Sequence, residues 1–293
     1  MGNSDNPRTE GDNWTITTIA ENWCQKDGED RGQCEGCPAH WEHHPDDGFD
    51  VDDPPPDGAA PSYGNGQSKN LEKVRIVIMG LEPGIHKEEG DSNSICEDIS
   101  ERIYERDIQT KGVNAGSLGN ASPLFESLNE ETAYWTQAKK CNEITSNKYS
   151  NNAAMAQCVG FGPYEGYLEK ELRVVNPDYV VTLGKDTHKI CIHMINEITN
   201  SNRSWKDERC DDESWSELVA NNNEYTGKFG IFNYFDNANI DFQFKLIPIP
   251  HPAYGIHQHT SGQFEENELE EEDTITKSYF KKVGQGLAEL LNS

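Results

Sequence analysis

The 293-residue sequence contains no run of apolar residues long enough to span a bilayer. Its first residues have neither the basic n-region nor the apolar h-region of a secretory signal peptide. We therefore expect a cytoplasmic protein that does not associate with membranes. Because disulfides are rare in that compartment, a metal site or a cluster is the first explanation for the eight cysteines.

Basic residues are also few, with 25 Lys and Arg against 52 Asp and Glu and a formal net charge of −27. The acids are spread between hydrophobic segments and six Trp residues, which is not the pattern of a disordered acidic tract. This distribution indicates an acidic surface adapted to a salty cytoplasm, so we expect a halophilic source. The charge argues against general affinity for nucleic acid in dilute buffer. It argues less against local contacts, because the Debye length falls to roughly 3 Å at molar salt.

Two phosphate-binding motifs are missing after the most strand-like run, VRIVIMG at 74–80. The turn that follows contains GLEPG, which fits neither G-x-x-x-x-G-K-[ST] nor G-x-G-x-x-G. Nucleotide-phosphate binding is therefore disfavoured. The turn carries one acid, Glu82, which is either a placed catalytic carboxylate or an acid stabilised by the dipole of a following helix.

Composition divides the chain into four segments. We expect a polar N-terminal tail at 1–22, a Cys/His-rich metal or cluster arm at 23–44, an acidic Pro/Gly-rich linker at 45–70, and an α/β domain at 71–293.

Strand and helix patterns alternate within the last segment. Apolar runs predict strands at 74–80, 134–141 and 179–184, and an aromatic run predicts another at 229–235. Apolar spacing of three and four predicts helices at 94–106, 123–130, 166–175, 187–198 and 275–291. This alternation predicts a three-layer α/β/α domain around a central, mainly parallel sheet.

The cysteines carry a stronger signal than their number. Cys34 and Cys37 have chelate spacing, and Cys141 with Cys158 could complete a four-thiolate site for an iron–sulfur cluster or zinc. A local zinc site is the alternative, built from Cys24, Cys34, Cys37 and one of His40, His43 or His44. A third interpretation makes Cys141 and Cys158 small core residues, as we expect Cys96, Cys191 and Cys210 to be.

His251 lies between Pro250 and Pro252 in the segment HPAY that follows KLIPIP. The two prolines restrict the backbone around the histidine to a stiff extended form. Such rigidity suits a positioned hydrogen-bond donor, although an ordinary loop histidine fits the same pattern.

The order of these motifs resembles the uracil-DNA glycosylase superfamily, and most closely its iron–sulfur branch, family 4. The shared features are a CxxC, a GLEPG loop after the first strand, KKC after the second, a Cys before NPDYVVTLG, and HPAY. The resemblance covers about residues 34 to 291 and implies the superfamily's α/β/α fold. Together with the acidic composition, it leads us to expect a divergent member of the family from a halophilic archaeon.

Carried over residue by residue, the resemblance implies a monomeric DNA repair enzyme that hydrolyses the N-glycosidic bond of a deaminated base, uracil first. Glu82 and His251 would be catalytic, and Cys34, Cys37, Cys141 and Cys158 would hold a 4Fe-4S cluster, with zinc as the alternative metal. The partner would be DNA containing a damaged or deaminated base. The substrate-binding residues would be Gly80, Leu81, Pro83, Gly84 and Gln137.

Three departures from the family pattern affect the substrate. Family 4 has its acid at the position of Leu81, whereas here the acid is Glu82, the position of Asp in family 1. Gln137 replaces the base-recognising Asn, and the Phe that stacks on the base has no clear counterpart. The alternative function is therefore a catalytically inactive or altered iron–sulfur or zinc protein that binds nucleic acid or a protein partner.

Overall fold

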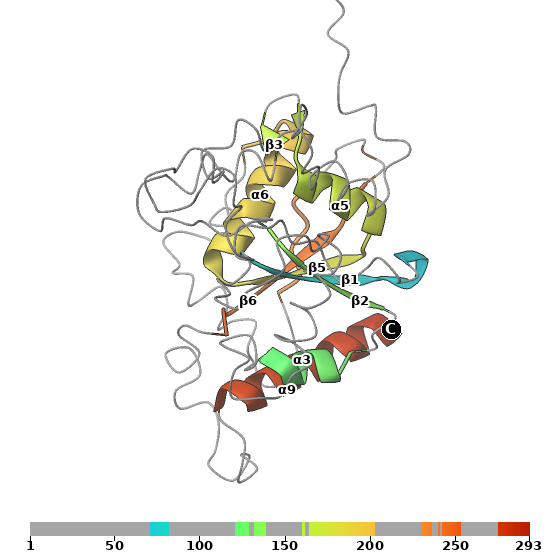
Figure 1. The fold of residues 1–293 in the computed structure, drawn as a ribbon, viewed down its shortest axis with the longest axis vertical. Coiled ribbons are helices and arrows are strands. Elements are labelled where there is room, and N and C mark those ends of the chain that lie inside the picture. The colour runs from blue at the N-terminus through green and yellow to red at the C-terminus, as the bar shows by residue number, and fades with distance from the viewer. Residues whose placement is uncertain are drawn as a thin grey trace, which may run out of the picture.

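The core of the protein is a four-stranded parallel sheet with helices on both faces (Figure 1). The computed structural model describes residues 71–81, 121–128, 132–138, 160–161, 164–202, 230–235, 240, 242–252 and 275–293. The strands are β1 (Ile76–Gly80), β2 (Ala133–Gln137), β5 (Tyr179–Leu183) and β6 (Lys245–Ile249). They lie in the order β2-β1-β5-β6, and each adjacent pair is parallel. Both faces of the sheet are covered, which explains why these strands are near-continuous apolar runs.

The described helices cover both sides of the sheet (Figure 1). One side carries α5 (Tyr167–Val175) and α6 (Lys185–Thr199), and the other carries α3 (Ser122–Glu126) and α9 (Ile275–Asn292). Alternate strand residues enter two separate hydrophobic clusters, one under each helix pair. The predicted three-layer α/β/α domain with a parallel sheet is confirmed.

Helix ends follow their sequence signals. Helix α5 ends at Asn176, which adopts a left-handed conformation with φ of 47° and precedes Pro177. Helix α6 ends in the same way at Asn200, with φ of 51°. Asparagine tolerates this conformation, and proline cannot continue a helix. A 3-10 turn at Leu71–Lys73 precedes β1.

A glycine allows α3 and α9 to pack closely. A Cβ on Gly284 of α9 would lie 2.7 Å from the carbonyl oxygen of Leu124 and 2.7 Å from Cβ of Ser127, both in or beside α3. The absence of a side chain on Gly284 therefore allows the two helices to lie this close together.

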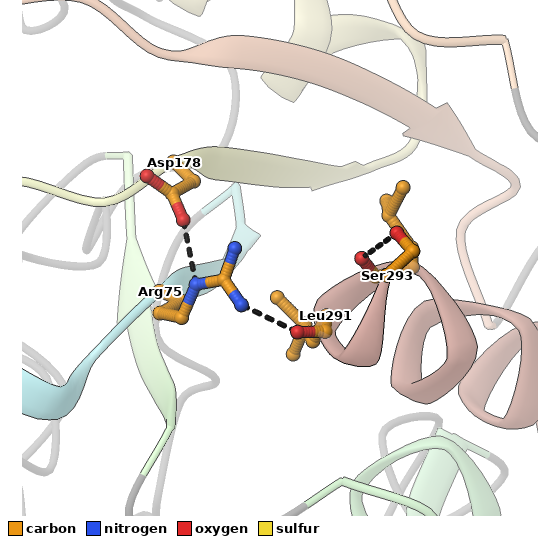
Figure 2. Close-up of polar contacts among 5 residues, drawn as sticks. Arg75, Asp178, Leu291 and Ser293 are labelled. Carbon is orange, nitrogen blue, oxygen red and sulfur yellow. Dashed lines mark hydrogen bonds and ion pairs between the residues drawn. The ribbon is translucent and has the colours of Figure 1, made fainter.

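At the amino ends of the strands, Arg75 joins three parts of the domain (Figure 2). Its Nε donates to Oδ2 of Asp178, just before β5, at 2.7 Å. Its Nη1 donates to the carbonyl oxygen of Leu291 in the last turn of α9. The guanidinium thus links the starts of β1 and β5 to the C-terminal helix, where a cation also favours the helix dipole.

Two features differ from the sequence-based expectations. The strand predicted at 229–235 is wrong over the described residues 230–235. There, Phe232 makes only an isolated antiparallel bridge with Leu246. Tyr234 and Phe235 are instead buried in the core, and the Phe235 ring packs edge-on against Phe244. The short antiparallel pair β3 (Gly160–Phe161) and β4 (Tyr164–Glu165) was not expected. The helix predicted at 94–106 lies outside the described residues.

None of the helices in the described part of the chain combines the length and the apolar character needed to cross a membrane.

Candidate active site

The predicted site residues that the structure describes lie at the carboxyl ends of the parallel strands. Gly80 ends β1 and pairs in register with Gln137, which ends β2. Leu183 at the end of β5 pairs with Ile249 at the end of β6, and His251 follows two residues later. Strand β2 lies on one side of β1, and the later strands β5 and β6 lie on the other side. The strand order therefore reverses between β1 and β5, which makes this position the switch point of the sheet. Ligands of open parallel sheets bind at such a switch point.

The amide of Gln137 lies directly against the backbone of Gly80. A Cβ on Gly80 would be 2.3 Å from Oε1 of Gln137 and 3.1 Å from Cη2 of Trp135. Gln137 is only 1% exposed, and alternation along β2 puts it on the same face as Trp135. Its side chain is therefore held in place by packing, as recognition of a polar ligand group requires.

His251 has an equivalent support in Gly184, the residue between β5 and α6. A Cβ on Gly184 would lie 3.0 Å from Cβ and 3.6 Å from Cγ of His251. The amide of Gly184 donates to the carbonyl oxygen of Ile249 at 2.8 Å, which joins this turn to the end of β6. Burial lowers the pKa of His251 below its usual value, so the imidazole is neutral near pH 7.

Leu81, the last described residue of the first loop, packs against the hydrophobic cluster on the α5 and α6 side of the sheet. Its side chain therefore contributes to the core. The first acid after Leu81 in the sequence is Glu82, which lies outside the described residues.

The remaining predicted site residues lie outside the described residues, so their predictions stay untested. They are Glu82, Pro83, Gly84, Cys34, Cys37, Cys141 and Cys158, together with Cys24, His40, His43 and His44 of the alternative zinc site.

The one described cysteine is buried as predicted. Cys191 on α6 is 0% exposed, and its Sγ lies 3.4 Å from Sδ of Met79. Within the described ranges there is no group of three or more His, Cys, Asp or Glu side chains arranged to hold a metal ion. Cys191 is thus a core residue of the α6 layer.

A second buried histidine, not singled out by its sequence, lies one turn into α6. Nδ1 of His188 is 3.0 Å from Oγ1 of Thr182, and its Nε2 is 3.3 Å from the hydroxyl oxygen of Tyr234. Burial lowers the pKa of His188 to about 3. The backbone amide of His188 donates to the carbonyl oxygen of Gly184 at 3.2 Å. This hydrogen bond ties the first turn of α6 to the glycine that lies against His251.

Comparison with known families agrees with this geometry. The family model of the uracil-DNA glycosylase superfamily matches residues 68–273, well over half of the chain. The chain belongs to the uracil-DNA glycosylase superfamily. No curated protein matches the sequence.

Membership in the uracil-DNA glycosylase superfamily supports DNA binding and glycosylase-like chemistry in general terms. The match begins at residue 68, close to the predicted start of the α/β domain at residue 71. Sequence reasoning missed Gly184 and Trp135, which lie beside His251 and Gly80 respectively. A glycine between an apolar strand and a helix is a recognisable signal for the first, whereas only the packing on Gly80 reveals the second.

Proposed function

We propose that the protein is a DNA glycosylase that hydrolyses the N-glycosidic bond of a deaminated base, uracil being the first candidate. The observation that supports it is the placement of Gln137 and His251 on Gly80 and Gly184, at the carboxyl ends of four adjacent strands in a chain of this superfamily. One amide and one neutral imidazole are thereby fixed at the edge where a ligand would bind.

The reaction requires the target nucleotide to leave the base stack and enter a pocket. As the glycosidic bond breaks, positive charge builds on the sugar and negative charge on the departing base. In the proposed mechanism, His251 donates an N–H to a base oxygen as that oxygen gains charge. A donor placed in this way is worth on the order of 10²–10³ in kcat.

Two other residues have proposed roles. Glu82 stabilises the sugar cation and orients the attacking water, and Gln137 hydrogen-bonds to the polar edge of the base. We propose Gly80, Leu81, Pro83 and Gly84 as the residues that form the rim of the pocket. Selectivity between bases that relies on paired polar groups is strong and depends on their geometry. Because Gln137 replaces the Asn of the family, another deaminated base is the alternative substrate.

The assay uses purified protein, in molar KCl, with oligonucleotides that contain uracil, hypoxanthine or xanthine. We expect alkali-labile abasic sites with the wild type and a loss of about 10²-fold or more in Glu82→Gln and His251→Ala. Glu72→Gln and His193→Gln are matched controls, because both residues are exposed and Glu72 precedes β1 at the opposite edge of the sheet. If the wild type releases none of the three bases, the proposed glycosylase activity is rejected.

We further propose that the protein is a divergent family 4 member and a monomer, with a structural 4Fe-4S cluster held by Cys34, Cys37, Cys141 and Cys158. Four thiolates suit such a cluster, and zinc is the alternative. We expect a brown protein that absorbs at about 400 nm and loses this band in Cys141→Ser. Cys191→Ala, in the core of α6, is the control that keeps it. A colourless protein with stoichiometric zinc would support the alternative.

A non-catalytic protein that binds nucleic acid or a protein partner is the second candidate. The observation that favours it is Leu81, whose side chain packs into the core at the position where family 4 has its acid. Binding of a uracil-containing oligonucleotide without release of the base would support this function.

A further inference from the structure

The four strand ends follow a regular pattern across the sheet. The two inner strands, β1 and β5, end at Gly80 and immediately before Gly184. The two outer strands, β2 and β6, carry Gln137 and His251 at or just beyond their ends. Each polar side chain lies against the glycine of the neighbouring inner strand. Both side chains are thus packed on backbone that borders the switch point between β1 and β5.

Gly184 is constrained in two independent ways. Its φ of 89° and ψ of 164° belong to a region that is essentially restricted to glycine. Its amide and its carbonyl are both bonded, to Ile249 and to His188 respectively. Because this backbone is fixed at both groups, an added Cβ at 3.0 Å from Cβ of His251 would displace the histidine.

Gly80 is constrained by the side chains of Gln137 and Trp135 that lie against it. It belongs to a regular strand and accepts a hydrogen bond from the amide of Ala138 at 2.9 Å. A Cβ would approach Oε1 of Gln137 to 2.3 Å, which is far inside van der Waals contact, and Cη2 of Trp135 to 3.1 Å. An alanine here would therefore move the amide of Gln137 without straining the strand.

We propose that Gly184 is a positioning residue for His251, as Gly80 is for Gln137, and that the two glycines set where these two side chains meet the flipped base. This inference rests on the proposed glycosylase function for its catalytic consequence. The two glycines act separately: Gly184 determines the stabilisation of charge on the departing base, and Gly80 determines which base is accepted.

The first test is Gly184→Ala, read by NMR of ¹⁵N-histidine-labelled protein and by kcat on the best substrate. The His251 imidazole signal is identified by its loss in His251→Asn. We expect this signal to shift and kcat to fall more than about tenfold with little change in KM, since displacements near 1 Å cost up to ~10²-fold. An unchanged His251 signal together with an unchanged kcat would overturn the proposal.

The matched variant is Gly80→Ala, which displaces a different side chain. We expect the ratio of kcat/KM for uracil to that for hypoxanthine to change more than about tenfold, because selectivity through a polar group depends on its position. The His251 signal should stay as in the wild type. A Gly80→Ala protein with the wild-type base ratio would overturn the role of Gly80.

A double variant covers the case in which Gly184→Ala does not fold. Gly184→Ala/His251→Gly takes away the contacted Cβ but keeps the backbone strain of alanine at a φ of 89°, so this protein is expected to be more stable than Gly184→Ala in urea unfolding. If it is no more stable, the turn alone demands glycine and the proposal is overturned. The NMR measurement needs no catalysis, so a wild type that cleaves no base rejects the proposed function while the support of His251 by Gly184 is still decided.

Discussion

At the scale of single residues, His188 and His251 differ in what surrounds them and therefore in what they can do. His188 is fully buried between Thr182 and Tyr234, whereas His251 is partly exposed at the edge of the sheet. Burial lowers the pKa of both. His188 thus reports on folding, whereas the role proposed for His251 is in binding the base.

The pH dependence of catalysis follows from the state of His251. Because burial lowers its pKa below the ordinary histidine value of 6.5, the imidazole is mainly neutral near pH 7. We expect kcat at saturating DNA to show no inflection near pH 6.5, with any loss due to protonation of His251 appearing at lower pH. The measurement is kcat between about pH 5 and 8. An inflection near 6.5 that disappears in His251→Asn would contradict the prediction.

The pH dependence of stability follows from the state of His188. Its pKa is about 3 in the folded protein and 6.5 when unfolded, so the unfolded chain binds one more proton between these values. Its contribution to stability is complete above pH 6.5 and is lost as the pH falls toward 3. We expect a slope of about 1.4 kcal/mol per pH unit well below pH 6.5, measured by urea unfolding.

His188→Gln is the comparison for this slope, because glutamine keeps a polar group but does not titrate. We expect the variant to be less stable at pH 7.5 by about 1–3 kcal/mol and to have a flatter dependence below pH 6.5. Equal slopes in the two proteins would show that His188 is not the titrating group.

At the scale of the elements, local pattern predicted most helices and strands to within a few residues. The strand predicted at 179–184 is Tyr179–Leu183, and the helix predicted at 275–291 is Ile275–Asn292. These elements carry their own signals, an apolar run and a repeat of three and four. The aromatic run at 229–235 failed because packing against other aromatic rings, and not strand pairing, buries Tyr234 and Phe235.

The packing of α3 on α9 can be tested at Gly284. Gly284→Ala would place a methyl group 2.7 Å from the carbonyl oxygen of Leu124, which is backbone and cannot rotate away. We expect a loss of about 1–3 kcal/mol in the free energy of unfolding, despite the better helix propensity of alanine. Gln285→Ala, at an exposed position of the same helix, is the control and should change stability by less than about 0.5 kcal/mol. A stabilised Gly284→Ala protein would contradict the close contact.

At the scale of the whole molecule, the order of motifs along the chain predicted more than any single motif. It implied that Gly80, Gln137 and His251 belong to one base-binding site, and the structure has these three residues at one edge of the sheet. It did not predict Gly184, because the need for glycine there arises from a contact with a residue 67 positions later, which no local pattern records.

The net charge of −27 makes a prediction for the entire chain. Repulsion between like charges weakens as the Debye length falls from ~10 Å at 0.1 M salt to ~3 Å at 1 M. We expect the midpoint of thermal unfolding to rise between these concentrations of KCl, measured by circular dichroism. Equimolar sucrose is the control for a general solute effect. A midpoint that falls with salt would argue against a halophilic protein.

The contact of Arg75 with the carbonyl of Leu291 holds the last turn of α9 beside the start of β1. This contact lies at the amino ends of the strands, away from Gly184 and His251. The same geometry directs any protein fused after Ser293 away from the edge where DNA is proposed to bind.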